Sequence, residues 1–204
     1  MAKKDLKKEL QSLYFPSAKE VTVVEVPPMN FAMVDGEGNP NDSNDFQEAL
    51  QALYGISYTL KFMLKKAGKA DYTAMPLEGL WWTDDAGGFD YESTKSAWKW
   101  TALIMQPDFV SRAHCKAAAA QLEKKKHPPA LPRVRFERFD EGLAVQIMHI
   151  GPYAAEKPTI ERLHGYAKEN GYRLAGKHHE IYLGDPRRTA PAKLKTVIRL
   201  PVDK

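Results

Sequence analysis

An acidic side chain lies between an imidazole and a phenol near the end of the chain, in the stretch HHEIYLGDPRR at residues 178–188. If this stretch is a strand, its side chains alternate between two faces, and His178, Glu180 and Tyr182 share one of them. Such a face is either exposed to water or lines a site that uses a carboxyl group among aromatic rings. In a site, the rings would raise the proton affinity of the carboxyl group. Glu180 could then exchange a proton with a ligand or with water, and Tyr182 could stabilise negative charge on a ligand oxygen.

A second stretch of similar character, PLEGLWWTDD at residues 76–85, predicts further site residues. Glu78 and Trp82 share one face of this predicted strand, whereas Trp81 faces the other way. Trp100 lies on the neighbouring predicted strand. Aromatic rings attract flat ligands and cations, at about 0.5–2 kcal/mol for each cation–π contact. Alternatively, Glu78 is a solvated strand residue and each tryptophan belongs to the core.

Two tyrosines complete the candidate site. Tyr153, in HIGPY, opens a predicted helix and either covers the site or holds the loop in place. Tyr54 and Tyr58 are one helical turn apart beside an apolar stripe, so either could reach the site. The candidate ligand-binding residues are therefore Glu180, Tyr182, Glu78, Trp82, Trp100, Tyr153 and Tyr54.

The composition limits the function classes. The net charge of +4 is small, and the lysine clusters contain no aromatic residues, so we expect no direct nucleic-acid binding. No apolar run reaches the ~18 residues of a membrane span. The single cysteine, Cys115, excludes an internal disulfide, favours a reducing cytoplasm and is more consistent with packing than with a nucleophile. Adjacent strand residues face opposite sides, so His178 and His179 cannot easily bind one ion, and we expect no metal site. We also expect no cofactor. We expect the protein to be a cytoplasmic monomer.

The chain divides into two similar halves, each with the order strand, strand, helix, strand, strand. The stretch HPPALP at residues 127–132 is the predicted boundary between the halves, after a connecting helix at about 107–126. We expect one α+β domain over residues 1–204 with pseudo-repeats at about 20–105 and 133–202. The predicted elements are strands 21–26 and 30–36, a helix from Asn44 to near Gly68, a strand pair 76–85 and 96–105 joined by a glycine-rich loop, a hairpin of strands 134–139 and 143–150, a helix that ends near Gly171, and a strand pair 177–183 and 194–202.

Six stretches of the sequence resemble the GyrI-like small-molecule-binding family, which is related to the effector-binding domains of multidrug-responsive transcription activators. They are VPPMNFAMVDGEGNPN, ALYGISYTLKF, PLEGLWW, EGLAVQIMHIGPY, TIERLHGYA and HEIYLGDPRR, in colinear order over residues ~20–202. The resemblance implies a pseudo-two-fold antiparallel sheet around a central pocket, with helices outside. It also implies that the pocket takes flat, hydrophobic and often cationic aromatic compounds, with Glu180 at the position of the family's buried acid.

The resemblance leaves three functions open. Only ~20 residues precede the first predicted strand, too few for a helix-turn-helix domain, so we expect a stand-alone binding domain. The first function is a binding protein for xenobiotics. The second is detoxification by hydrolysis, because the LEGLWW stretch resembles cyclopropanoid cyclopropyl hydrolases, which open the cyclopropane of DNA-alkylating natural products in an aromatic cage. In that case Glu180 and Tyr182 would be the catalytic residues. The third is a protein-binding regulator of the gyrase-inhibiting kind, which the positive net charge does not favour.

Overall fold

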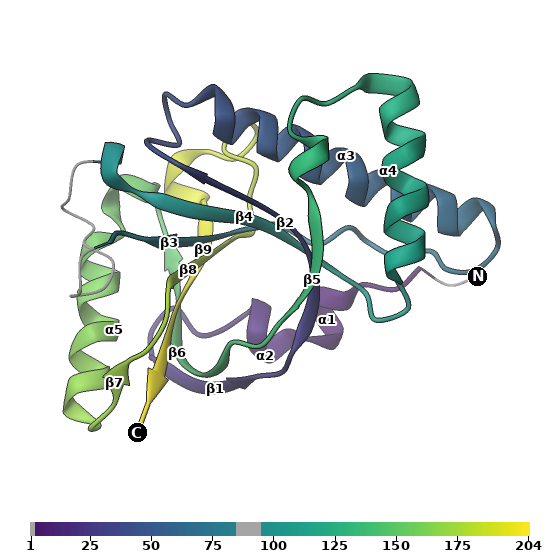
Figure 1. Cartoon of the computed structure of the whole chain (residues 1–204). Helices are drawn as coiled ribbons and strands as arrows, with labels where there is room; N and C mark the ends of the chain where they lie inside the picture. Colours follow the sequence, from purple (N-terminus) through teal and green to yellow (C-terminus); the bar gives the residue numbers. More distant parts are fainter. Residues whose placement is uncertain (1–2, 85–94) are drawn as a thin grey trace.

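The computed structural model describes residues 3–84 and 95–204, which form an α+β structure, as predicted (Figure 1). The glycine-rich loop between the third and fourth strands falls largely on residues 85–94, outside the described part. The described strands are β1 (Thr22–Val26), β2 (Met29–Glu37), β3 (Leu77–Trp82), β4 (Lys99–Gln106), β5 (Arg135–Phe139), β6 (Gly142–Ile150), β7 (Arg173–Leu174), β8 (His178–Tyr182) and β9 (Lys195–Asp203). The α-helices are α1 (Leu6–Glu9), α2 (Gln11–Tyr14), α3 (Asn44–Lys66), α4 (Arg112–Lys126) and α5 (Lys157–Glu169), and the short 3-10 helices are η1 (Lys95–Ala97), η2 (Leu131–Arg133), η3 (Tyr153–Ala155) and η4 (Pro191–Lys193).

The strands form one antiparallel sheet in the order β1-β6-β9-β8-β3-β4-β2-β5, and β7 adds to β9. This order is symmetric about the β8–β3 pair. Each half of the chain donates its first strand to the other half, since β1 pairs with β6 and β5 pairs with β2. The predicted hairpin of residues 134–139 and 143–150 is therefore wrong. The chain does not reverse at Gly142, which has a φ of 71°. β5 and β6 follow one another in the same direction and pair with β2 and β1 in one continuous antiparallel register.

Two helices cover one face of the sheet, which we call the helical face, on either side of β3 and β8. The helix α3 contacts β2 and β4, and α4 packs against α3, whereas α5 contacts β6 and β9 (Figure 1). Phe46 of α3 contacts Trp81 and Trp100 on this face. The core under α5 contains Ile198, which is aligned with Glu180. The middle of the helical face, along β3 and β8, thus lies between α3 and α5.

Local hydrogen bonds set the helix starts. Ser43, one residue before the predicted start, caps α3, because its side chain accepts a hydrogen bond from the Phe46 amide at 3.4 Å. The predicted connecting helix at about 107–126 begins only at Arg112. The Val110 amide first closes a turn onto the Pro107 carbonyl, and Ser111 then caps α4. In the described part of the chain, no helix is both long and apolar enough to cross a membrane.

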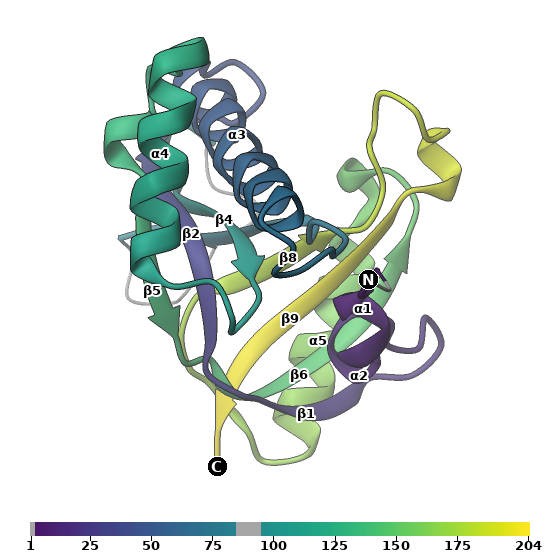
Figure 2. The same cartoon turned by 90° about the vertical axis from the view of Figure 1, so that its right-hand side faces the viewer.

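The sequence analysis missed the two short helices at the N-terminus. Figure 2 shows α1 and α2 near β1, on the side of the molecule away from α4. Leu13 and Tyr14 of α2 are buried, and Lys4 pairs with Tyr72 through a short parallel bridge. These contacts attach the N-terminal segment to the sheet.

Candidate functional site

The register of β8 places the predicted acid on the helical face. Glu180 is aligned with Gly79 of β3, and Tyr182 is aligned with Leu77. His178 is aligned with Trp81, so His178, Glu180 and Tyr182 share one face as the alternation of the strand predicts. All three side chains are buried or partly buried.

Hydrogen bonds hold both oxygens of the Glu180 carboxyl group. Its Oε1 lies 2.9 Å from His178 Nε2, and its Oε2 accepts a hydrogen bond from the Tyr182 hydroxyl at 2.7 Å. The indole Nε1 of Trp81 in turn donates to the Tyr182 hydroxyl oxygen at 3.1 Å. The carboxyl group therefore has a fixed position, and Tyr182 already uses its proton to hold it.

A second carboxyl group, that of Glu156, faces Glu180. Glu156 precedes α5 and is 1% exposed. Burial and then the charge of Glu180 raise the pKa of Glu156 to about 9. Burial also tends to raise the pKa of Glu180, but the hydrogen bond and charge of His178 and the bond from Tyr182 lower it overall. Near neutral pH, Glu156 is therefore protonated and Glu180 is ionised.

Several polar atoms around the two carboxyl groups are buried without a hydrogen-bond partner among residues 3–84 and 95–204. They are Glu156 Oε1, His149 Nε2 and Thr196 Oγ1. His149 lies on β6 and holds Thr159 through its other ring nitrogen at 2.9 Å, and Thr196 is aligned with both His149 and Tyr182. Buried polar atoms in this state mark a place where water or a ligand can bind.

Aromatic side chains lie next to Glu180. The rings of Tyr153 and Tyr182 meet edge to face with centroids 5.5 Å apart. Burial raises the pKa of Tyr153 to about 12, so its hydroxyl remains protonated. Tyr54, on α3, is 36% exposed, and burial and then Tyr58 raise its pKa. The structure thus gathers Glu180, Tyr182 and Tyr153, with Tyr54 at the edge.

Glu78 does not join this group. It is aligned with Ile181 rather than Glu180, so it lies on the opposite face of the sheet. There it is 1% exposed, accepts a hydrogen bond from the Tyr14 hydroxyl at 2.8 Å and lies 3.0 Å from His179 Nε2. A relative shift of one residue between the two similar stretches is enough to reverse the face of the side chain. Glu78 is also not the solvated residue that the sequence allowed.

Glu78 instead belongs to a buried ionic network. His179 Nδ1 lies 2.8 Å from Glu141, and Arg199 donates to Glu141 at 2.9 Å and to the Leu13 carbonyl at 2.8 Å. Burial tends to lower the pKa of His179, but Glu141 and then Glu78 raise it to about 9. Burial tends to raise the pKa of Glu141, but the charges of His179 and Arg199 lower it to about 2. His179 and Glu141 are therefore both ionised near neutral pH, and the network joins α2 to both halves of the sheet.

The tryptophans are also distributed differently from the prediction. Trp82 lies on the opposite face, where Lys177 Nζ is 3.3 Å from its ring centroid. Trp100 is fully buried on the helical face and meets Phe46 edge to face at 4.9 Å, so it is a core residue. Trp81 is the tryptophan that contacts the Glu180 group. The alternation that separates Trp81 from Trp82 was visible in the sequence, but the register that selects between them was not.

The other residues that the sequence analysis missed are Glu156, His149 and Thr196. Glu156 follows the HIGPY stretch by only three residues, and an acid between that stretch and a helix is the one signal that could have found it. His149 lies within the stretch itself.

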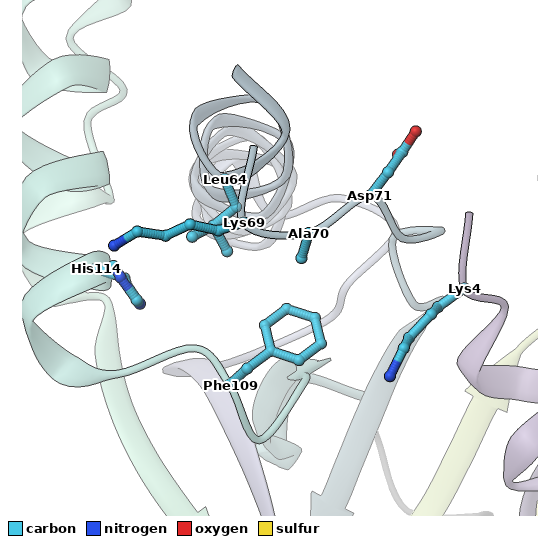
Figure 3. A pocket seen from close by; sticks show the side chains of 7 residues that line it. All are labelled: Lys4, Leu64, Lys69, Ala70, Asp71, Phe109 and His114. Carbon is cyan, nitrogen blue, oxygen red and sulfur yellow. The ribbon is translucent and has the colours of Figure 1, made fainter. Parts of the chain in front are cut away.

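Two cavities lie elsewhere in the described part of the chain. One, of about 260 Å³, lies around Phe109, with Lys4 on one side and the end of Lys69 beside His114 on the other (Figure 3). The other, of about 400 Å³, lies on the opposite face of the sheet and includes Leu80 and Glu141. Neither contains Glu180 or Glu156.

Comparisons with known proteins agree on the fold. A protein from Listeria innocua described as an uncharacterized conserved protein is 42% identical, with a TM-score of 0.91 over 98% of this chain and 100% of the other. Two Listeria innocua structures described as hydrolases are each 41% identical, with TM-scores of 0.86 and 0.88 over 98% and 99% of this chain and 100% of theirs. The C-terminal domain of EcmrR, at 16% identity, has the same fold with a TM-score of 0.56 over 91% of this chain and 98% of that domain. A comparison with curated proteins gave no match.

The family comparison confirms the resemblance that the sequence predicted. The model of the GyrI-like small molecule binding domain matches residues 19–203. Because this match covers almost the whole chain, the protein belongs to the GyrI-like small-molecule-binding-domain family.

Proposed function

We propose that the protein is a hydrolase that binds a flat, hydrophobic small molecule between α3 and α5 and adds water to it. The observation that carries the proposal is a pair of facing buried carboxyl groups with opposite pKa shifts, raised for Glu156 and lowered for Glu180. One group is an acid and the other a base near neutral pH, which general acid–base catalysis requires. Two similar Listeria innocua proteins described as hydrolases add support.

The substrate class implied by the resemblance is a strained cyclopropane conjugated to a carbonyl group. In the reaction, the oxygen of a water molecule bonds to the ring methylene, and a carbon–carbon bond of the cyclopropane breaks. The electron pair of that bond moves through the conjugated system to the carbonyl oxygen. Glu180 takes the proton of the water, and Glu156 gives its proton to the carbonyl oxygen. Transfer of a proton from Glu180 to Glu156 restores the pair, so the net reaction adds one water.

The hydrogen bonds around Glu180 assign a different role to Tyr182 from the one that the sequence suggested. The Tyr182 hydroxyl donates to Glu180 and accepts from Trp81, so its proton is not directed at a ligand. We therefore treat Tyr182 as a positioning residue for the base. Tyr153 and Trp81 supply ring faces and edges for a flat ligand.

Binding without turnover is the second candidate. An ionised carboxylate attracts a ligand cation at ~4 Å by roughly 4 kcal/mol at an effective dielectric constant of about 20, before desolvation costs. However, both oxygens of Glu180 already have partners in His178 and Tyr182. A carboxylate held in this way is better suited to a fixed base than to a general receptor for cations.

The test is a single-turnover assay with a cyclopropane-bearing alkylator, in which the product gains the mass of one water. We expect Glu180→Gln and Glu156→Gln each to lower the rate by ~100-fold or more while the ligand still binds. Tyr182→Phe should also lower the rate, because Glu180 loses a bond that holds it. Glu161→Gln, an exposed glutamate on α5, is the matched control and should leave the rate unchanged.

Two results would decide against the proposal. Rates within ~3-fold of the wild type for both Glu180→Gln and Glu156→Gln, far below the usual effect, would remove these residues as catalysts. No product, together with a Glu180→Gln variant that loses affinity for a flat cation but not for its neutral analogue, would establish the binding function instead.

A further inference from the structure

Three aromatic side chains form a stacked row on the exposed side of α3. Tyr54, Tyr58 and Phe62 follow one another at every fourth residue and are 36%, 46% and 59% exposed. The ring centroids are 6.4 Å apart for the first pair and 6.3 Å for the second, with interplanar angles of 26° and 23°. Single exposed aromatic residues are ordinary, but an aligned set of three forms a continuous apolar strip. We call this strip the aromatic ladder.

The aromatic ladder continues the line of the Glu180 site. At one end of β3, Trp81 contacts Phe46 of α3, and at the other end Leu77 interacts through its backbone with Tyr54. From Phe46 to Tyr54 the helix rises by about 12 Å, close to the length of four strand residues. Phe46 and Tyr54 of α3 are therefore placed at opposite ends of β3. Phe62 lies about 12 Å further along the helix, beyond the end of β3.

Charged side chains accompany both ends of the aromatic ladder. Lys61 Nζ lies 5.8 Å from the centroid of the Phe62 ring. Arg187, on the loop after β8, is held by two hydrogen bonds of 3.0 Å to Asp185, and both charges act on Tyr54, that of Asp185 more strongly than that of Arg187. A planar guanidinium that is exposed and fixed in this way can stack on a flat ring. At Tyr54 the charges of Asp185 and Arg187 oppose each other, whereas at Phe62 the charge of Lys61 favours a neutral or anionic aromatic group over a cationic one.

We propose that the aromatic ladder is an outer subsite for the distal rings of an elongated, flat, multi-ring ligand whose reactive end lies at Glu180. The position of the reactive end rests on the proposed function. The outer subsite concerns the length of the ligand and the charge of its distal rings, which are independent of the reaction at Glu180. An elongated ligand with a neutral distal ring system should bind more tightly than a compact ligand with the same reactive end. A cation on the distal rings should remove this advantage.

The test compares a compact cyclopropane alkylator with an elongated one that carries additional neutral aromatic units. In the double variant Tyr58→Ala/Phe62→Ala, we expect kcat/KM for the elongated ligand to fall by roughly 10-fold or more, on the scale seen when stacking rings are removed elsewhere. The value for the compact ligand should remain unchanged. Tyr58→Phe keeps the ring and should behave as the wild type. Phe15→Ala removes an exposed ring elsewhere and is the matched control.

Binding of the ring-opened products, followed by tryptophan fluorescence, separates failure of the subsite from failure of the proposed hydrolysis. If neither alkylator is hydrolysed, but the double variant still weakens binding of the elongated product alone, the subsite stands and the hydrolysis does not. Equal effects of the double variant on compact and elongated ligands would overturn the subsite. Self-association of the wild type that the double variant abolishes would also overturn it, because the aromatic ladder would then be an interface between copies.

Discussion

The carboxyl groups of Glu156 and Glu180 are chemically identical, but their surroundings shift their pKa values in opposite directions. Glu180 has a hydrogen-bond partner at each oxygen, which stabilises its ionised form. Glu156 is buried beside that charge, and its Oε1 has no partner in the part of the chain that the structure describes. Ionising both at once would place two negative charges together in a buried place. The first proton lost from the pair therefore comes from Glu180, and Glu156 keeps its own.

This division of roles predicts the pH dependence of turnover. The single-turnover rate should be low in acid, where Glu180 is protonated, and should rise to a plateau around neutral pH. It should fall again as the pH approaches about 9, where Glu156 loses its proton. Rates measured from pH 4 to pH 10 check this profile. In Glu156→Gln the alkaline fall should disappear along with most of the rate, and an unchanged alkaline limb would show that another group causes it.

Alternation along one strand was enough to predict that His178, Glu180 and Tyr182 share a face. It was not enough to choose between Trp81 and Trp82, because that choice depends on the register between β3 and β8, which forms over a separation of about a hundred residues. Glu156 was not predicted, because its significance comes from Glu180, with which it shares no periodic pattern. Its raised pKa results from tertiary burial.

Three hydrogen bonds attach the short helix α2 to the sheet: Gln146 donates to the Ser12 carbonyl, Arg199 donates to the Leu13 carbonyl, and the Tyr14 hydroxyl donates to the buried Glu78 carboxyl group. Tyr14 donates to Glu78, which otherwise has only His179 as a partner among the contacts described. We expect Tyr14→Phe to lower the free energy of unfolding by about 1–3 kcal/mol, because a buried carboxylate oxygen loses its donor. Urea denaturation measures this change.

Tyr72 provides the matched control. It is as deeply buried as Tyr14, but its hydroxyl has no hydrogen-bond partner within residues 3–84 and 95–204. Tyr72→Phe should therefore leave the free energy of unfolding nearly unchanged. Equal losses for the two variants would mean that the Tyr14–Glu78 bond adds nothing beyond packing.

The elements differ in how far the sequence predicted them. The strands β3 and β4, and β8 and β9, pair as expected, because strands that follow one another in the sequence are usually neighbours in a sheet. The hairpin of β5 and β6 was wrong, because the residues around Gly142 show only that one strand ends and another begins, and the chain continues there in the same direction. The helices α1 and α2 have four residues each, too few to show a periodic apolar pattern. They form because Leu13 and Tyr14 pack against the sheet and are buried there.

The stability of the whole molecule should fall as the pH rises through the neutral range. His179 has its pKa raised from 6.5 to about 9, and Glu156 from 4.5 to about 9, so the folded chain holds protons that the unfolded chain has released. Each group contributes a slope of up to about 1.4 kcal/mol per pH unit within its window. Urea midpoints at pH 6.5, 7.5 and 8.5 should decrease in that order. Glu156→Gln should have a smaller slope, and a rising midpoint would contradict both assignments.

The exchange of first strands between the halves has a consequence for how the chain is made. Thr22 of β1 meets Gln146 of β6, 124 residues later, so β1 has no partner while the ribosome is still producing the first half. The outer edge of β2 likewise has no partner until β5 has been synthesised. Open strand edges in an unfinished chain are templates for aggregation, and contacts over such distances form slowly. The sheet can therefore close only after β9 has left the ribosome, and until then the unpaired strand edges of the first half remain open.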